Sequence, residues 1–187
     1  MEGIFTLSYS EYSVANKLNS LLKRHGCSIY IPASRQQKGI DLMIHKNGTR
    51  SIARIQIKSS RSYIGKEKSK YSYYLWLNNF VEKYEKNVSD FYIIYGLFSV
   101  PNSKDKITTK NKIWKEIFLC YSDKEMSTLL KRIKTKTDNK TDSFYGYGFN
   151  SSKEIYLDRG FSSIKNKNAS DYLLDRRVNE IIEFLND

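Results

Sequence analysis

The asparagine–glycine pair at residues 47 and 48 constrains the fold more than any other feature of the sequence. It separates two short apolar runs, residues 40–45 and 51–59. An Asn-Gly pair between two such runs is the strongest short-range signal for a β-hairpin. The sequence therefore predicts an antiparallel hairpin over residues 40–59.

One face of this hairpin carries polar groups. If the turn consists of two residues only, counting back along both strands places Asp41 opposite Arg54. Gln56 and Lys58 follow Arg54 at intervals of two and share its face, while Ile55 and Ile57 point to the other face. A second interpretation remains open, in which Asp41 and Arg54 form an ion pair and Lys58 is a solvated cation.

Helix and strand signals continue along the chain. A Ser-x-x-Glu capping box at residues 8–11, followed by apolar residues at helical spacing, predicts a helix over residues 10–25. Further strands are expected at residues 28–32, 71–78, 90–100 and 112–121, a helical turn at 81–87, and helices at 122–133 and 169–185. This alternation predicts an α/β fold.

The length of 187 residues indicates one domain with a C-terminal extension. We expect residues 1–133 to form the α/β domain, and residues 134–187 to add a polar loop and an amphipathic helix packed on that domain. The apolar stripe of this helix is Leu174, Val178, Ile181 and Leu185. The alternative use of the stripe is contact with a second copy in a homodimer.

Positive charge is the most unusual property of the composition. Lysine and arginine total 32 against 20 aspartate and glutamate, a net charge of +12. Residues 44–70 hold eight of the basic residues and one acidic residue, Glu67. A polyanionic partner is the expected reason, and a solvated protein face is the alternative. Binding to a membrane surface fits less well, because this segment is predicted as strand and loop.

Several other classes of protein are excluded. Two cysteines and two histidines are too few for a disulfide framework or a zinc site. The longest apolar run, residues 91–100, is half of the ~20 residues that cross a bilayer. We therefore expect a cytoplasmic protein that does not associate with membranes.

Glu11 joins the polar face of the hairpin as a candidate functional residue. It lies three residues before Val14 and seven before Leu18, so it is aligned with the apolar stripe of the first helix. Its alternative role is that of the acid in the capping box. Two acids, an amide oxygen and a lysine within the most basic part of the chain are what metal-assisted hydrolysis of a phosphodiester requires.

These residues resemble a known family. Glu11, Gly39-Ile40-Asp41, a spacer of 14 residues and then Gln56-Ile57-Lys58-Ser59-Ser60 are similar to the motif of the PD-(D/E)xK nuclease superfamily. The resemblance covers about residues 8–61, and it is strongest to archaeal Holliday junction resolvases and to small prokaryotic members. It implies a restriction-endonuclease-like core, which is a mixed central β-sheet flanked by helices in the order α-β-β-β-α-β, with a C-terminal helical addition.

The resemblance also implies a role for each site residue. Asp41 is the central metal ligand, Glu11 is a further ligand, and Lys58 orients the attacking water or stabilises the transition state. Gln56 takes the second acidic position and offers its side-chain oxygen, with the Ile57 carbonyl nearby. The cofactor would be Mg²⁺, with Mn²⁺ as a substitute. Because Gln56 replaces an acid, the site has one negative charge fewer than the family pattern.

The basic residues around this motif are candidate contacts to nucleic acid. They lie before Asp41, on the hairpin, and directly after it: Arg35, Lys38, Arg54, Arg61, Lys66, Lys68 and Lys70. The alternation of residues 71–77 predicts a two-faced core strand in preference to a surface that stacks on bases.

The expected function is a metal-dependent endodeoxyribonuclease of the resolvase, restriction or repair type. One alternative is a catalytically inactive module of the same fold that binds nucleic acid. Another is a basic interaction protein whose lysines serve a protein or RNA partner.

Overall fold

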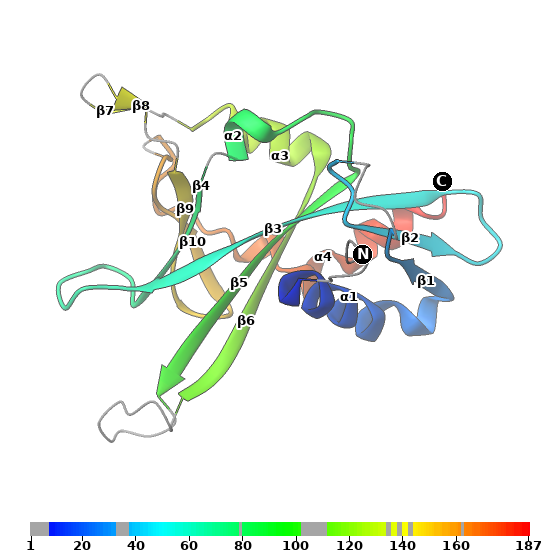
Figure 1. Cartoon of the computed structure of the whole chain (residues 1–187), viewed down its shortest axis with the longest axis horizontal. Coiled ribbons are helices and arrows are strands. Elements are labelled where there is room, and N and C mark those ends of the chain that lie inside the picture. Colours follow the sequence, from blue (N-terminus) through cyan, green and yellow to red (C-terminus); the bar gives the residue numbers. More distant parts are fainter. Residues whose placement is uncertain are drawn as a thin grey trace, which may run out of the picture.

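The chain folds as a mixed α/β structure in which a curled mixed sheet is flanked by helices (Figure 1). The computed structural model describes residues 8–32, 38–78, 80–101, 112–133, 136–137, 140–141, 144–161 and 163–187. Its helices are α1 (Tyr9–Leu22), α2 (Phe80–Lys83), α3 (Asp123–Leu130) and α4 (Leu174–Phe184), with 3-10 turns at Lys23–His25 and Ser170–Tyr172. Among the described helices, none has the length and apolar character needed to cross a membrane.

Eight strands form the main sheet, and two short ones pair separately. The main sheet contains β1 (Cys27–Tyr30), β2 (Leu42–Lys46), β3 (Ile52–Ile64), β4 (Tyr73–Asn78), β5 (Phe91–Pro101), β6 (Lys112–Ser122), β9 (Phe144–Ser151) and β10 (Glu154–Leu157). The separate pair is β7 (Lys136–Thr137) with β8 (Lys140–Thr141). Most predicted elements are confirmed with shifted ends, and β4 stands between β3 and α2 in the chain order.

Strand β3 is the branch point of the sheet. One of its edges pairs in parallel with β5 over residues 55–61. The opposite edge pairs first with β2 over residues 52–55 and later with β4 over residues 62–64, both antiparallel. In the described ladders, residues 56–61 therefore have a strand partner on one edge only. We call this interval the β3 gap.

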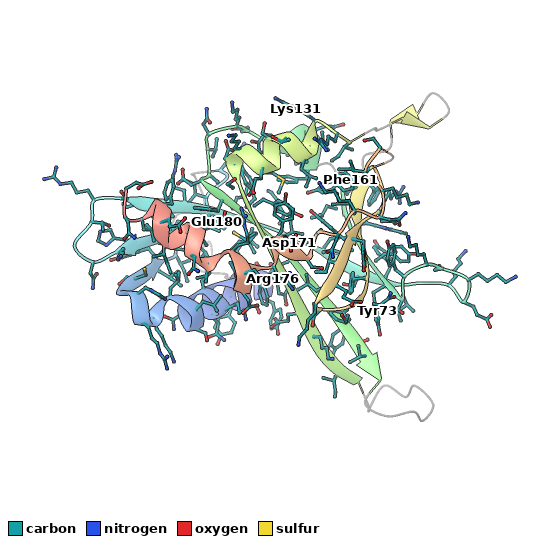
Figure 2. The ribbon with its side chains drawn as sticks, turned by 180° about the vertical axis from the view of Figure 1, so that it is seen from behind. Tyr73, Lys131, Phe161, Asp171, Arg176 and Glu180 are labelled. Carbon is teal, nitrogen blue, oxygen red and sulfur yellow. The ribbon has the colours of Figure 1, made fainter. Side chains whose placement is uncertain are left out.

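Alternate residues of the central strands supply two separate cores. Ile55 and Ile93 face a core that includes Val14 and Leu18 of α1 and Ile181 of α4. Seen from behind, α4 lies over the same face of the sheet as α1 (Figure 2).

The second core lies on the opposite face of the sheet. There, Ile94 and Phe98 of β5 face Phe80 of α2, Met126 of α3 and Phe149 of β9. Helices thus cover both faces of the central strands, and the curled strands β4, β9 and β10 close the second core.

The hairpin exists, but its predicted register is wrong by two residues. Leu42 pairs with Ile55 and His45 with Ile52, so continuing the ladder places Asp41 opposite Gln56 and not opposite Arg54. The turn closes at Asn47-Gly48, but its amide at Asn47 donates to the Gly26 carbonyl at 2.9 Å. The turn itself is closed by the Thr49 amide, which donates to the Lys46 carbonyl at 3.2 Å, and the ladder between β2 and β3 begins only at the pair of His45 and Ile52. A shift by two leaves every side chain on its predicted face.

The prediction that residues 134–187 contain only a polar loop and a helix is wrong. Strands β9 and β10 lie in this region, and β9 pairs with β4 along its length. The sequence did not predict β9, because Gly146 and Gly148 alternate with its aromatic residues and glycine lowers the propensity to form a strand. A Cβ at Gly148 would lie 2.0 Å from Cδ2 of Tyr71, so this position needs glycine.

The stripe of the C-terminal helix packs within its own chain. Leu174, Ile181 and Leu185 are fully buried in the core beneath α1. This is the first of the two uses that the sequence left open. The described chain needs no second copy to cover the stripe.

Candidate functional site

A cavity of about 440 Å³ lies between β3, the segment before β2 and the loop that joins α2 to β5. Two of the predicted catalytic residues, Gln56 and Lys58, line it. The full lining is Lys38, Gly39, Gln56, Lys58, Glu82, Lys83, Glu85 and Val88. The sequence motif does not include Glu82 and Glu85, because Glu82 lies on α2 and Glu85 in the loop after it, far from the motif along the chain. Arg35 lies outside the described residues.

Gln56 is a buried polar residue at the base of this cavity, and its side chain is 9% exposed. A Cβ at Gly39 would lie 3.4 Å from Nε2 of Gln56 and 2.6 Å from Cγ1 of Val88. Gly39 therefore makes the close approach possible, and its φ of 88° also favours glycine. The Gln56 side chain lines the cavity. Its amide atoms are not among the buried polar atoms of the described residues that lack a hydrogen-bond partner.

Asp41 lies at the edge of β3, directly before the first residue of β2. Its amide donates to the Ile55 carbonyl at 2.8 Å, and its Oδ2 accepts the Ile57 amide at 2.6 Å. The amide and carbonyl of one strand residue point to the same edge. The Ile57 carbonyl therefore also lies on the edge of the β3 gap, beside Asp41.

Lys58 lies on the cavity side of β3 and is partly buried. Its Nζ is 5.2 Å from the centre of the Phe80 ring. Burial lowers the pKa of Lys58, and nearby Lys83 lowers it further, whereas the negative charge of Asp41 raises it. Lys58 is thus a partly desolvated cation within electrostatic range of Asp41, and the interpretation as a solvated strand-end cation is wrong.

Glu11 has the local role that the capping box predicts. It is buried on α1, and its Oε2 lies 3.4 Å from the Ser8 amide. Helix α1 covers the face of β3 that carries Ile55 and Ile57, opposite to the face of Gln56. Glu11 is not among the described residues that line the cavity. In the part of the chain that the structure describes, no three His, Cys, Asp or Glu residues gather as a metal cluster.

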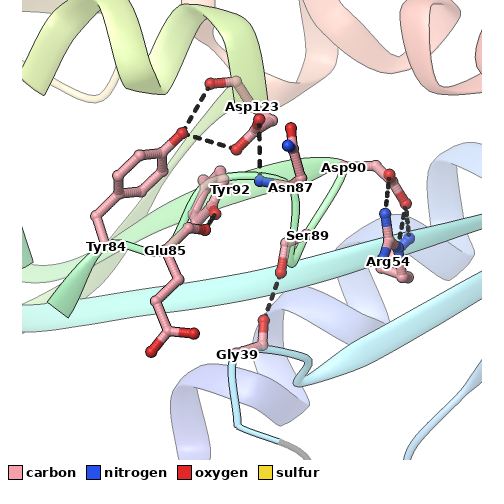
Figure 3. A network of polar contacts seen from close by, with 9 residues as sticks. All are labelled: Gly39, Arg54, Tyr84, Glu85, Asn87, Ser89, Asp90, Tyr92 and Asp123. Carbon is pink, nitrogen blue, oxygen red and sulfur yellow. Dashed lines mark hydrogen bonds and ion pairs between the residues drawn. The ribbon is translucent and has the colours of Figure 1, made fainter.

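Arg54 has a different partner from the one that the sequence predicted. Asp90 at the start of β5 accepts its Nε at 3.0 Å, its NH2 at 2.8 Å and its backbone amide at 2.8 Å (Figure 3). The hydrogen bond to Asp90 raises the pKa of the Arg54 guanidinium. The ion pair expected between Asp41 and Arg54 is wrong. Because Asp90 engages the guanidinium, less of it is available to a phosphate.

Polar contacts hold the loop that forms one wall of the cavity (Figure 3). The Tyr84 hydroxyl donates to Oδ1 of Asp123 at 2.7 Å, and the Tyr92 hydroxyl donates to the Glu85 carbonyl at 3.1 Å. The Ser89 hydroxyl donates to the Gly39 carbonyl, which ties this wall to the segment before Asp41. Hydrogen bonds therefore hold the backbone on two sides of the cavity, in the loop between α2 and β5 and in the segment before Asp41.

The link between Arg54 and Asp90 should contribute measurably to stability. We expect Asp90→Ala to lower the free energy of unfolding by about 1–3 kcal/mol, because the Arg54 amide and guanidinium lose their acceptor. Urea titration followed by circular dichroism measures this. Asp171→Ala is the matched control, since that carboxylate is 87% exposed and pairs with exposed Arg176. Equal effects of the two substitutions would contradict the prediction.

The other predicted basic contacts lie outside the cavity. Lys66, Lys68 and Lys70 are exposed in the loop between β3 and β4, which projects from the body of the protein (Figure 1). Arg61 is part of β3, but its side chain is not among those described.

The site offers oxygen donors to a hard cation. These are the Asp41 carboxylate, the Gln56 side-chain oxygen and the Ile57 carbonyl. No protein-family model matches this chain, and no curated protein has a matching sequence.

Proposed function

We propose that this protein is a divalent-metal-dependent endodeoxyribonuclease that hydrolyses DNA phosphodiesters at the β3 gap. The observation that carries this proposal is the combination of groups around the gap. Asp41 lies on the edge of β3, the Gln56 side chain lines the cavity, and partly desolvated Lys58 follows two residues later.

The donor set fits Mg²⁺, with Mn²⁺ as a substitute. Magnesium prefers oxygen ligands, is bound by one or two protein carboxylates and keeps several waters. Asp41, Gln56 and Ile57 supply oxygens at the gap, whereas Glu11, the further ligand that the resemblance implies, serves the capping box of α1 and does not line the cavity. When bound, the cation would lower the pKa of a water and polarise the phosphoryl oxygens. The Gln56 side chain supports this fit, because it lines the cavity and carries an oxygen that can bind a cation.

The remaining residues support the reaction through charge and position. The Ile57 amide orients the Asp41 carboxylate, so the carboxylate keeps its place without substrate. Lys58 supplies a positive charge in a partly buried setting, where electrostatic stabilisation of a phosphorane-like charge is stronger than in water. Lys38 at the cavity and the exposed lysines after β3 would contact phosphates without reading sequence.

The order of elements supports a restriction-endonuclease-like core. Helix α1 precedes the antiparallel strands β1, β2 and β3, and β5 returns parallel to β3 after α2. This is the α-β-β-β-α-β order if β4 is counted as an insertion between β3 and α2. The gap between β2 and β4 then lies beside the motif.

A second candidate function is DNA binding without cleavage. It is favoured by Gln56 at the second acidic position and by the use of Glu11 in the capping box. The described residues also contain no cluster of three acids. In this alternative, the exposed lysines still bind DNA phosphates, but the residues at the β3 gap do not hydrolyse the phosphodiester.

Removal of the metal separates the two functions. We expect the protein to nick supercoiled plasmid with Mg²⁺ or Mn²⁺ and to leave it intact in EDTA, because water activation at the gap requires the cation. Agarose gel electrophoresis over time measures nicking, and a gel shift in EDTA measures binding. Binding without cleavage under every metal condition would favour the second candidate. Cleavage that persists in EDTA would contradict the metal site.

A further inference from the structure

A row of aromatic side chains lies on the face of β3 and β4 that is turned away from the core. Tyr73, Leu75 and Leu77 of β4 face the core, so Tyr74 and Trp76 lie on the opposite face. Tyr63 of β3 pairs with Tyr74, and Tyr156 of β10 is placed on this face by its pairing with Gly148. We call Tyr63, Tyr74, Trp76 and Tyr156 the aromatic face.

The rings of the aromatic face lie close to the sheet because β9 carries glycines beneath them. Gly146 pairs with Trp76, and a Cβ there would lie 2.7 Å from Cδ1 of Trp76. Tyr63 stacks on Trp76 with ring centres 4.7 Å apart and an angle of 29° between the planes. Tyr63 is nevertheless 40% exposed. The stack therefore presents an accessible ring at its outer end.

Positive charge surrounds this face. The Arg159 guanidinium lies 5.0 Å from the centre of the Trp76 ring, and Lys70 lies 5.5 Å from that of Tyr71. Lys66 and Lys68 are exposed in the loop that joins β3 to β4, with Glu67 as the acid between them. A partner with flat apolar rings and a negatively charged backbone complements this combination.

We propose that the aromatic face binds an unpaired segment of nucleic acid, whose bases stack on Tyr63 and its neighbours while its phosphates contact the lysines of the β3–β4 loop. In a duplex the faces of the bases are already stacked, so an aromatic platform favours a single strand. Such stacking tolerates any sequence because every base has a flat face.

This inference rests on the proposed function for its link to catalysis, and it specifies the substrate class. Tyr63 lies five positions after Lys58 on β3, roughly 17 Å at the rise of an extended strand, and this odd spacing places the two side chains on opposite faces of the strand. A strand of DNA held by the aromatic face therefore has to pass around the edge of β3 to reach the gap, and an unpaired segment bends in this way more readily than a stiff duplex. The substrate class is DNA in which an unpaired segment adjoins the phosphodiester to be cut, such as a flap or a branch.

Binding in EDTA tests the inference without any cleavage. We expect a fluorescent oligo(dT) to bind more tightly than a duplex of the same length, and Tyr63→Ala to raise the Kd for oligo(dT) roughly tenfold, the scale of one base–aromatic stack. Tyr63→Phe should keep the affinity, because it keeps the ring. The matched control is Tyr30→Ala, since Tyr30 on β1 is 51% exposed and lies at the other end of the sheet. Fluorescence anisotropy measures each Kd.

A second readout does not depend on altering the aromatic face. The protein has two tryptophans, Trp76 and Trp114, and Trp114→Phe leaves Trp76 as the single emitter. Saturating oligo(dT) should then quench the Trp76 emission, whereas a duplex should quench it less. An unchanged emission, a Tyr63→Ala variant that binds as tightly as wild type, or equal affinity for duplex and single strand would each overturn the inference.

The outcomes also separate this inference from the nuclease proposal. If oligo(dT) quenches Trp76 but the protein cleaves no DNA, the nuclease proposal is contradicted and binding by the aromatic face is supported. If Tyr63→Ala cleaves flapped and linear DNA at the wild-type rate, the nuclease proposal is supported and binding by the aromatic face is contradicted. Self-association that buries Trp76 without DNA, detected by analytical ultracentrifugation, would assign this face to a second copy and overturn the inference.

Discussion

Asp41→Asn is expected to lower the rate of metal-dependent DNA nicking by about a hundredfold to a thousandfold, the scale seen when one charged or hydrogen-bonding group is removed from a preorganised site. The amide that replaces the carboxylate can still accept the Ile57 amide, so the edge of β3 should keep its geometry. What is lost is the negative charge that would hold the cation. Single-turnover nicking of supercoiled plasmid at saturating protein measures the rate.

Binding and folding controls identify the cause of the loss. The Asp41→Asn variant should bind DNA in EDTA within about twofold of wild type, because the exposed lysines that contact phosphates are unchanged. Asp171→Asn removes an exposed carboxylate far from the gap along the chain and should nick at the wild-type rate. Lys58→Met keeps an apolar stem near Phe80 and should be as inactive as Asp41→Asn. An Asp41→Asn variant that nicks at the wild-type rate would place the chemistry elsewhere.

Phe149→Ala is expected to lower the free energy of unfolding by about 3–5 kcal/mol, the usual cost of emptying a buried phenylalanine site. Phe149 on β9 is fully buried, stacks on Tyr73 at 5.5 Å between ring centres and contacts Phe98 at 5.0 Å. Few neighbours can refill the space, because the rings that surround it come from two other strands, β4 and β5. Urea unfolding followed by circular dichroism measures the loss.

The size of this loss tests whether β9 belongs to the cooperative core. Ile64→Ala is the control, since Ile64 is 72% exposed on β3 and should change stability by less than about 0.5 kcal/mol. Unfolding of the wild type should follow one transition in both circular dichroism and tyrosine fluorescence. A loss below about 1 kcal/mol for Phe149→Ala, or two separate transitions, would contradict the placement of β9 in the core.

Local signals predicted the parts of the site that lie close together in the sequence. The capping box at residues 8–11 starts α1, and the Asn-Gly pair produces the turn between β2 and β3. The period of two along β3 correctly separates Gln56 and Lys58 from Ile55 and Ile57. These features depend on neighbours within a few residues, so the sequence carries enough information for them.

Contacts between distant segments decided the rest. The register of the hairpin pairs Leu42 with Ile55, two residues away from the register that a two-residue turn predicts. The partner of Arg54 is Asp90, 36 residues away, and the wall of the cavity depends on Asp123 holding Tyr84. A local sequence pattern does not predict which of several acidic residues will form an ion pair with a given basic residue. That choice follows from the packing of β5 beside β3.

By itself, the sequence determined the helix that Ser8 caps, the hairpin, and the faces on which Gln56 and Lys58 lie, because helices and strands repeat with periods that side-chain polarity reveals. Only the tertiary structure decided that β2 and β4 leave β3 unpaired between them in the described ladders. Only the tertiary structure also revealed β9, because rings from β4 and the loop before it lie over Gly146 and Gly148. The physical reason is that the propensity of a strand is local, whereas the pairing that stabilises it comes from residues far away in the chain.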